Sequence, residues 1–496
     1  MRSFLLDRFL LTQITPAVYL PGPTICTFFV TNRQIYIELI TFREPTIMSK
    51  PPFRPLLVLV LASLLFLPNV TRSQSGATPV IDRGRGKEML QSIKNALKET
   101  YYDPNFRGMN VDNRFRQAEE QINKATSTGQ ILAIIAQALV ELDDSHTMFF
   151  PPELVVEPDF GFKLQMIGDT CYVNNIKAGS DAEKKGLKVG DVIYAIEGFE
   201  PTRDSLWKII YSYFVLLPQP TLKLTIREPK GTFKEFLVEA AVSKNKIRKI
   251  ESIINSEVRP SFYELAPETI ICRLPEFNLA DGEVDNMIKR IRSSQNLILD
   301  LRGNPGGRVS MEQRLVGSLF DHDVKIGDEK ERKKTSPRMA KTRGPNNIFP
   351  GKVFVLVDSQ SGSAAEVFAR IMQLEKRGMV IGDRSAGKVM TSVQATFAFN
   401  TPAAASFQFT RVAFYGANIT IADLIMSDGK SLEKTGVTPD LLLLPTPEDL
   451  ATGCDPILAR AATLAGTTID SEKAGVIHKE LYEAEKKAEE KAKEKN

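Results

Sequence analysis

Two uninterrupted apolar segments, residues 297–301 and 353–357, constrain the fold of this chain more than any other feature. A strand that is apolar at every position is buried on both faces, which is typical of a parallel sheet covered by helices. A helical pattern around residues 311–320 lies between the two segments, in the strand–helix–strand order of such sheets. The sequence therefore predicts an α/β core with a helix-covered, mainly parallel sheet over residues 266–450.

The composition is that of an ordinary globular protein. The 496 residues are 43% hydrophobic and 25% charged, which excludes a collagen-like, a wholly disordered and a multi-span membrane chain. Domains of roughly 100–200 residues would divide this length into about three. The net charge of +4 gives no sign of the strongly basic surface that nucleic-acid binding requires, so we expect no nucleic-acid partner.

Cysteine and histidine residues show no pattern of a zinc site or a disulfide framework. Four cysteines cannot form a disulfide framework in a chain of this length, and no CxxC pair or Cys/His cluster with zinc spacing occurs. We therefore expect neither a metal site nor an organic cofactor. A mechanism that uses an imidazole has three candidates, His146, His322 and His478.

An apolar run of twelve residues, 56–67, follows Lys50 and Arg54. It is too short to span a membrane, which takes about 20 residues, but it fits the core of a secretory signal. We expect a signal peptide over residues 48–77, starting at Met48, with residues 1–47 outside the mature protein. The protein would then be exported to a periplasmic or extracellular location, whereas an uncleaved segment would anchor it to a membrane.

Three further regions flank the predicted core. Residues 84–152 show the three- and four-residue apolar spacing of amphipathic helices, and residues 153–245 change to short alternating strands around one helix. Residues 451–496 are predicted as a C-terminal helix and charged tail, of which residues 479–496 form an exposed helix or a frayed end. Within the core, the basic stretch 327–344 is predicted as a solvated loop.

The motif Gly-Leu-x-x-Gly-Asp-x-Ile at residues 186–193 lies inside the strand-rich region 153–245. With this motif the region resembles a PDZ domain. The resemblance implies a groove between a strand edge and a helix, which binds an extended peptide as an added strand. Backbone N–H groups of Phe160, Gly161 and Phe162 would cradle a terminal carboxylate. The alternative is a small β-domain whose groove is filled.

A turn rich in serine and glycine, residues 358–363, joins the apolar segment 353–357 to a predicted helix. Ser363 would begin that helix, where unpaired backbone N–H groups can stabilise an oxyanion. Ser363 is therefore a candidate nucleophile, in competition with Ser359 and Ser361 of the same turn. An N-cap hydroxyl is the commoner role for a serine in this position and is the alternative.

A serine needs a general base to become a nucleophile. Lys388 lies between Gly387 and the apolar pair Val389-Met390, which we expect to be a buried, strand-like setting. Burial there would lower the pKa of the amine towards neutrality. The alternative is an ordinary lysine at the end of a strand that reaches solvent.

Ser363 stands three residues before Glu366, and Lys388 follows Ser363 by 25 residues. Together with Leu-Asp-Leu-Arg-Gly-Asn-Pro-Gly-Gly at 299–307 and Gly-Val-Thr-Pro-Asp at 436–440, this spacing resembles the carboxyl-terminal processing (tail-specific) protease family. The resemblance covers about residues 84–450. It implies a serine peptidase in which Ser363 is the nucleophile and Lys388 the base.

The same resemblance implies the groups around the two residues. Backbone N–H groups of Gly306 or Gly307, with that of Ala364, would form the oxyanion hole. The family's orienting glutamine, four residues after the lysine, is replaced here by Ser392. Ser392 itself or Gln394 would then orient the lysine.

A second base is available in the Asp-Ser-His element at residues 144–146. This element is similar to that of tricorn-type proteases, in which the histidine is the base and a distant glutamate orients it. The analogy implies the arrangement Ser363–His146–Glu433. We favour Lys388 as the base and keep His146 as the alternative.

Taken together, these features predict an exported serine endopeptidase that acts through an acyl-enzyme. Its partners would be polypeptides, cleaved at or near C-terminal or unfolded segments after capture by the PDZ region. The alternative from another class is a non-catalytic peptide- or lipid-binding scaffold on the same fold.

Overall fold

The computed structural model describes residues 25–31, 34–40, 81–152, 156–228, 231–244, 259–402 and 410–495. The predicted signal segment 48–77 lies outside these residues. Of residues 1–47 they include only the antiparallel hairpin of β1 (Ile25–Thr31) and β2 (Gln34–Ile40), which belongs to a separate unit. Within the described part of the chain, no helix combines the length and the apolar character needed to cross a membrane.

A six-stranded sheet forms the centre of the C-terminal half and confirms the predicted α/β core. Its strand order is β11-β12-β13-β16-β17-β20, with β11 antiparallel to β12 and every other pair parallel. The interior strands are buried on both faces, as their apolar sequences predict. The strands are β11 (Ser261–Ala266), β12 (Thr269–Arg273), β13 (Asn296–Asp300), β16 (Lys352–Val357), β17 (Gly378–Gly382) and β20 (Leu441–Leu442).

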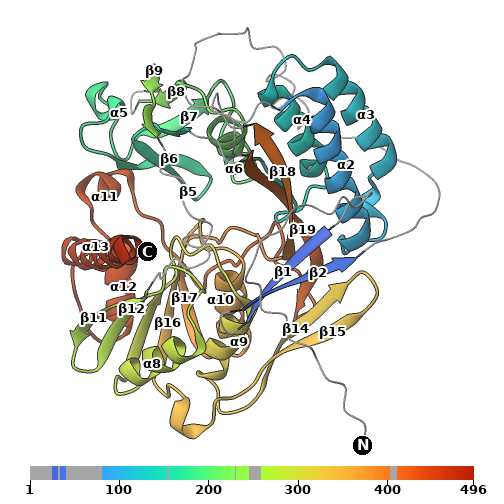
Figure 1. The fold of residues 1–496 in the computed structure, drawn as a ribbon. Coiled ribbons are helices and arrows are strands. Elements are labelled where there is room, and N and C mark those ends of the chain that lie inside the picture. Colours follow the sequence, from blue (N-terminus) through green and yellow to red (C-terminus); the bar gives the residue numbers. More distant parts are fainter. Residues whose placement is uncertain are drawn as a thin grey trace, which may run out of the picture. The chain divides into compact units, whose positions relative to one another are not determined.

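Helices cover both faces of this sheet (Figure 1). One face packs against α8 (Asp281–Ile291), α9 (Val309–Gly317) and α10 (Ala364–Leu374). The opposite face packs against α12 (Pro456–Leu464) and α13 (Ser471–Lys495), which follow α11 (Pro447–Thr452).

The C-terminal region is therefore more than an exposed helix with a charged tail. Leu458 of α12 and Leu481 of α13 are buried against Ile298 and Ile381 of the sheet. The prediction for the tail is wrong at this point, because the second face of a two-sided sheet needs an apolar cover and these helices provide it.

A second sheet has the order β15-β14-β19-β18, and β3 (Met148–Phe150) also pairs with β19. Its strands are β14 (Val324–Glu331), β15 (Thr335–Ala340), β18 (Thr391–Pro402) and β19 (Thr410–Met426). The solvated loop predicted at 327–344 is wrong: most of it is the β14–β15 hairpin, followed by a 3₁₀ turn, Pro345–Asn347. Arg338 of this hairpin is buried because Glu312 and Glu329 compensate its charge.

The N-terminal helical region consists of α2 (Arg83–Thr100), a short 3₁₀ turn (Phe106–Gly108), α3 (Val111–Lys124) and α4 (Thr128–Val140). Every residue from Ile131 to Val140 is buried, in keeping with the apolar composition of this segment. The helices share one apolar cluster with β19 and with the strand-rich region that follows them.

The strand-rich region forms a five-stranded antiparallel sheet in the order β5-β6-β7-β8-β9. Its strands are β5 (Phe162–Ile167), β6 (Thr170–Ile176), β7 (Val192–Ile196), β8 (Thr221–Arg227) and β9 (Phe233–Glu239). The helices are α5 (Asp181–Lys184) and α6 (Leu206–Ile210), which continues as a π-helical turn, Tyr211–Leu216. A pair of short strands, β4 (Val156–Asp159) and β10 (Ala241–Lys244), links the region to the chain on either side.

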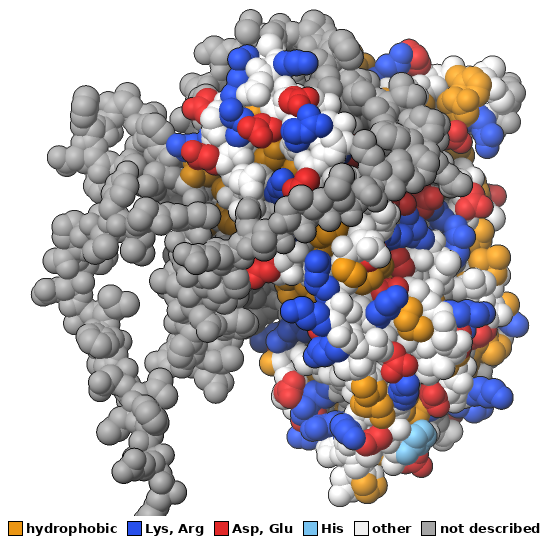
Figure 2. Space-filling view, turned by 90° about the vertical axis from the view of Figure 1, so that its right-hand side faces the viewer, with side chains coloured by type: hydrophobic (Ala, Val, Ile, Leu, Met, Phe, Trp, Pro, Cys, Tyr) orange, Lys and Arg blue, Asp and Glu red, His pale blue; other side chains and the backbone are white. Residues whose placement is uncertain are grey.

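The parallel strands place three loops at one edge of the core sheet. The segments after β13, β16 and β17 (residues 301–307, 358–363 and 383–390) all leave the carboxyl ends of adjacent strands. In open α/β sheets this edge is where ligands bind. On the face shown in Figure 2, basic and acidic side chains are interspersed.

Candidate active site

Ser363 is the N-cap residue of α10, and its side chain makes no capping hydrogen bond. Its backbone N–H donates to the carbonyl oxygen of Lys388 at 2.7 Å and to Oε2 of Glu366 at 3.1 Å. These bonds hold Ser363 at φ 51° and ψ −119°, a left-handed region that disfavours residues with a Cβ. Strained backbone of this kind is typical of functional positions, and the hydroxyl group is left available.

The two competing serines use their hydroxyl groups for structure. Ser361 is fully buried and donates from Oγ to the carbonyl oxygen of Leu301 at 2.8 Å. Ser359 donates from Oγ to the carbonyl oxygen of Met166 in β5. Among the three serines of the turn, Ser363 is therefore the one whose hydroxyl group is suited to chemistry.

Glu366 fixes the two loops of the site to each other. Its fully buried carboxylate accepts hydrogen bonds from the N–H groups of Ser363, Gly387 and Lys388 and from the hydroxyl group of Ser385. Burial raises the pKa of Glu366 to about 7, while these four donors favour the ionised form. One carboxylate thus joins the loop after β16 to the loop after β17.

Lys388 does not lie on a strand, contrary to the prediction. It belongs to the irregular segment between β17 and β18, where Gly387 has φ +71°. Burial lowers the pKa of the Lys388 amine, and the nearby carboxylates of Glu366 and Glu433 oppose this shift. Its Nζ lies 5.4 Å from the centroid of the Trp207 ring.

His146 is linked to Glu433 through Ser145, a residue that the sequence reasoning did not assign. Ser145 Oγ lies 2.7 Å from His146 Nδ1 and donates to Glu433 Oε2 at 2.8 Å, while Ser145 N–H donates to Glu433 Oε1 at 2.8 Å. Because the Ser145 proton is directed at Glu433, the imidazole must donate from Nδ1 to Ser145. That tautomer leaves Nε2 as an acceptor, the state required of a general base.

The charge of His146 is suppressed by its surroundings. Burial lowers the pKa of His146 to about 4, the positive charge of Lys388 acts in the same direction, and Asp144 opposes both. The imidazole is therefore neutral at physiological pH. Of the other two histidines, His322 is exposed beside Asp321, and His478 lies on α13 near Asp455.

Asp144 fixes the backbone of the histidine. Its Oδ1 accepts from the N–H groups of His146 and Thr147 at 2.9 and 2.6 Å and from the hydroxyl group of Thr420 at 2.9 Å. Its Oδ2 accepts from the buried Tyr101 hydroxyl group at 2.8 Å. The N-terminal helical region, through Tyr101 at the end of α2, thus takes part in positioning His146.

The predicted oxyanion residues lie against the nucleophile. A Cβ atom at Gly306 would be 2.5 Å from Ser363 Cβ and 2.8 Å from Ala364 N, so only glycine fits there. The Gly306 N–H donates to Asn304 Oδ1 at 2.8 Å and is thus already used. Among the described residues no group accepts a hydrogen bond from the N–H of Gly307 or of Ala364.

The two residues predicted to orient the lysine lie on β18. Ser392 is half-buried opposite Thr420, whereas Gln394 is exposed opposite Asn418. The charged groups that act on Lys388 are instead Glu366 and Glu433. Neither residue of β18 is needed to explain the setting of the lysine.

The predicted carboxylate cradle of the strand-rich region is partly closed. Gly161 N–H donates to Asp159 Oδ1 at 2.9 Å, and Phe160 is buried in contact with Phe214. The expectation that all three N–H groups of residues 160–162 are available is therefore wrong at Gly161. Phe162 begins β5, the edge strand.

The edge of β5 already contacts the loop that carries the nucleophile. The carbonyl oxygens of Leu164 and Met166 accept hydrogen bonds from Gln360 Nε2 and Ser359 Oγ. Gln165 Nε2 donates to Asp358 Oδ2 at 2.8 Å. The carbonyl oxygens of Leu164 and Met166 are the backbone groups that an added peptide strand would use.

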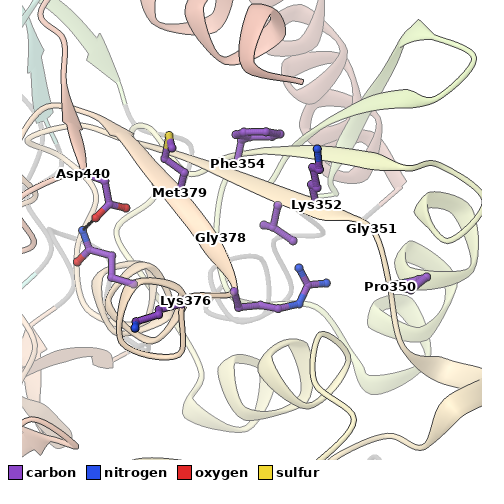
Figure 3. A pocket seen from close by; sticks show the side chains of 11 residues that line it. Pro350, Gly351, Lys352, Phe354, Lys376, Gly378, Met379 and Asp440 are labelled. Carbon is purple, nitrogen blue, oxygen red and sulfur yellow. Dashed lines mark hydrogen bonds between the residues drawn. The ribbon is translucent and has the colours of Figure 1, made fainter. Parts of the chain in front are cut away.

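A cavity of about 530 Å³ lies elsewhere, at the amino ends of β16 and β17 (Figure 3). Its lining includes Lys352, the first residue of β16, and Gly378 and Met379, the first two residues of β17. Ser363 follows the carboxyl end of β16, at the opposite edge of the sheet. The cavity is thus separate from the site of Ser363. No cluster of residues suited to hold a metal ion occurs in the described ranges.

Family comparisons agree with the two resemblances drawn from the motifs. Residues 269–443 match Peptidase family S41, and residues 156–205 match the PDZ domain. A tail-specific protease of Haemophilus influenzae is 25% identical over 346 residues, which cover 64% of this chain and 46% of that protein. A "Probable CtpA-like serine protease" of Staphylococcus haemolyticus is 23% identical over 68% of this chain and 62% of its own length. The chain thus matches less than two thirds of either relative.

Comparison with solved structures shows the same fold. The crystal structure of mature CPAF aligns with a TM-score of 0.54 at 15% identity, covering 74% of this chain and 94% of the other. The S41 and PDZ matches confirm the resemblance to the carboxyl-terminal processing proteases, and the fold class predicted for the core is confirmed.

Proposed function

We propose that this chain, which carries an S41 peptidase domain and a PDZ domain, is a serine endopeptidase with Ser363 as its nucleophile. One observation carries the proposal: Ser363 begins α10 without using its hydroxyl group as a cap, beside two backbone N–H groups that no described residue accepts. A hydroxyl group and two free donors at a helix start are what acyl transfer needs. The substrates would be polypeptides, cleaved at or near C-terminal or unfolded segments.

We favour His146 as the base because hydrogen bonds through Ser145 orient its imidazole, although among the described residues none joins it to Ser363. Ser363 Oγ attacks the scissile carbonyl carbon while His146 Nε2 takes its proton; the imidazolium then protonates the leaving amine as the C–N bond breaks. Water hydrolyses the resulting acyl-enzyme through the same proton transfers. Ser145 and Glu433 support this role, because they hold the imidazole in the tautomer with a free Nε2.

Lys388, favoured from the sequence, remains the alternative base. Its lowered pKa is in keeping with a neutral amine, but its ammonium group lies over the Trp207 ring. If Lys388 were the base, His146 would have a structural role through its hydrogen bonds in the loop. The two assignments differ in the pH at which the enzyme becomes active.

The tetrahedral oxyanion would be bound by the N–H groups of Gly307 and Ala364. Gly306 donates no hydrogen bond to the oxyanion, since its own N–H is bonded to Asn304. The absence of a side chain at Gly306 leaves room beside Ser363. Two such donors stabilise the developing negative charge without reorganisation. Glu366 supports the arrangement by fixing the backbone of Ser363.

Substrate capture would take place at β5. A peptide that adds to this edge must replace the side chains of Ser359 and Gln360 on the carbonyl oxygens of Met166 and Leu164. Capture is therefore coupled to the loop that ends in Ser363. Export from the cytoplasm is proposed on the sequence of residues 56–67 alone.

A fluorophosphonate probe tests the proposed function. The probe should label the wild-type protein and fail to label Ser363→Ala, while Ser359→Ala, a serine of the same turn, should still be labelled. Labelled wild type should also lose its activity on an unfolded protein such as denatured casein. A wild-type protein that neither reacts nor cleaves but binds peptides would identify a non-catalytic scaffold instead.

A further inference from the structure

Trp207 is the one tryptophan of the chain and lies on α6, the helix of the proposed peptide groove. Its ring centroid is 5.4 Å from Nζ of Lys388 and 5.6 Å from Nζ of Lys208. An ammonium group within about 6 Å of an aromatic face is attracted by the ring quadrupole. A side chain of the PDZ domain therefore contacts a residue of the candidate active site.

Lys388 has little else to hold its ammonium group. Among the described residues no carboxylate lies within ion-pairing distance of it, and Glu366 and Glu433 act only through longer-range attraction. Their oxygens are engaged, those of Glu366 by four donors and those of Glu433 by Ser145 and Val389. The indole face, with its centroid 5.4 Å from Nζ, is thus the group that lies beside the amine.

A second contact secures the same arrangement. Arg203, four residues before Trp207, donates to Asp383 Oδ2 at 2.6 Å and to the carbonyl oxygen of Arg384 at 2.8 Å. The segment that begins at Asp383 and contains Lys388 is therefore held by α6 and the residues before it at two points. A rotation of α6 would move the indole relative to the amine.

The position of the Lys388 amine matters for His146, because their charges interact. Other charged groups near the histidine are Asp144 and, through Ser145, Glu433. Around α6 the charged groups are Lys208, Asp204 and the ion pair of Asp143 with Lys434. None of these groups around α6 acts on the pKa of His146, whereas Lys388 does.

We propose that Trp207 is a positioning residue for the reaction: its indole face replaces water around the Lys388 amine and so sets the charge that His146 experiences. The inference rests on the proposed function and extends it from the catalytic residues to the peptide-binding helix. It assigns α6 a part in tuning the base as well as in lining the groove.

The first test is optical and does not need activity. Emission of Trp207, excited at 295 nm, should change with pH as Lys388 loses its proton, with a midpoint below the ordinary lysine value of about 10.4. Lys388→Met should abolish the transition, whereas Lys208→Met, which removes the other ammonium group near the ring, should retain it. A transition that persists in Lys388→Met, or its absence from the wild type, would overturn the proposal.

The second test is the pH dependence of Ser363 labelling by a fluorophosphonate. Trp207→Leu removes the aromatic face, weakens the repulsion of His146 by the amine and should move the acid limb of the profile to higher pH, with the loss of rate confined to that limb. Trp207→Phe keeps an aromatic face and should restore most of the wild-type limb. An equal loss at every pH, with no rescue by phenylalanine, would mean a purely structural role. If the wild type is not labelled at all, the proposed function fails and with it the role of Trp207 in the reaction, whereas the optical test still shows whether the indole senses the charge of Lys388.

Discussion

The backbone N–H of Ser363 donates to the carbonyl oxygen of Lys388 at 2.7 Å. A separation of 25 residues in the sequence is thus a direct contact in space, made where the loops after β16 and β17 leave the same edge of the sheet. Glu366 reinforces the contact by accepting from the N–H groups of both residues. The two loops therefore behave as one structural unit, and the predictions below test its parts.

The pH dependence of Ser363 labelling should identify the base. With His146 as the base, the rate should rise tenfold per unit below pH 4 and level off above about pH 5, because the pKa of His146 is about 4. His146→Gln should remove this limb together with most of the rate. A rate that still rises steeply between pH 7 and 9, and is lost in Lys388→Met instead, would assign the role to Lys388.

His146 should also make stability depend on pH. Its folded pKa of about 4 lies below the ordinary value of 6.5, so between these values the unfolded state binds more protons and stability falls as the pH falls. The effect is at most about 3 kcal/mol. Urea unfolding at pH 4.5 and 7 should show a smaller pH effect in His146→Gln than in the wild type. Equal pH effects in the two proteins would contradict the buried, neutral state of the imidazole.

Ser145→Ala should lower the labelling rate about 100-fold, because the imidazole loses the group that fixes its tautomer. Ser145→Thr keeps a hydroxyl group in the same place and should stay within a few-fold of the wild type. The melting temperatures of both variants would be measured alongside the rates. A similar rate in Ser145→Ala and wild type would show that Glu433 does not act through this hydroxyl group.

Asp455→Asn should destabilise the protein by about 3 kcal/mol, because it leaves the buried Arg302 guanidinium without one of its two carboxylates. Arg302 begins the loop that ends in Gly306 and Gly307, so labelling should slow as well. Asp321→Asn, at an exposed pair with His322, is the matched control and should not change the melting temperature. Unchanged unfolding of Asp455→Asn would mean that the C-terminal helices do not support this loop.

Removal of the side chains of Ser359 and Gln360 should tighten peptide binding at β5 about tenfold, since two hydrogen bonds no longer compete with the added strand. Fluorescence anisotropy of a labelled peptide with a free C-terminus would measure this in the Ser363→Ala background, where cleavage cannot occur. The same peptide with an amidated C-terminus is the control for carboxylate recognition. Weaker binding in the double variant would place the peptide elsewhere than on this edge.

The parts of the fold that local sequence determines were predicted well. The interior strands β13 and β16 are apolar throughout because helices cover both faces of the sheet, and α4 is buried on all sides as its composition indicates. The turn before α10 was found because serine and glycine residues between a buried strand and a helix mark the start of that helix. The resemblance to the carboxyl-terminal processing proteases then paired Ser363 with Lys388.

The parts that depend on distant partners were missed. The basic hairpin β14–β15 was predicted as a solvated loop because nothing near Arg338 in the sequence shows that Glu312 and Glu329 compensate its charge. Ser145 was not assigned because its partner, Glu433, lies 288 residues away. For the same reason charge alone misled the prediction for the C-terminal tail, where Glu485 pairs with the buried Arg273.

The left-handed backbone of Ser363 favours glycine for stability, whereas the proposed chemistry requires a hydroxyl group. Glycine would adopt φ 51° with less strain than serine, so replacing Ser363, the proposed nucleophile, by glycine would relieve the backbone while removing the hydroxyl group that the proposed reaction needs. Stability alone would thus favour glycine, which has no hydroxyl group, at this position. A serine in a position so ill suited to a side chain points to a role of this residue other than support of the fold.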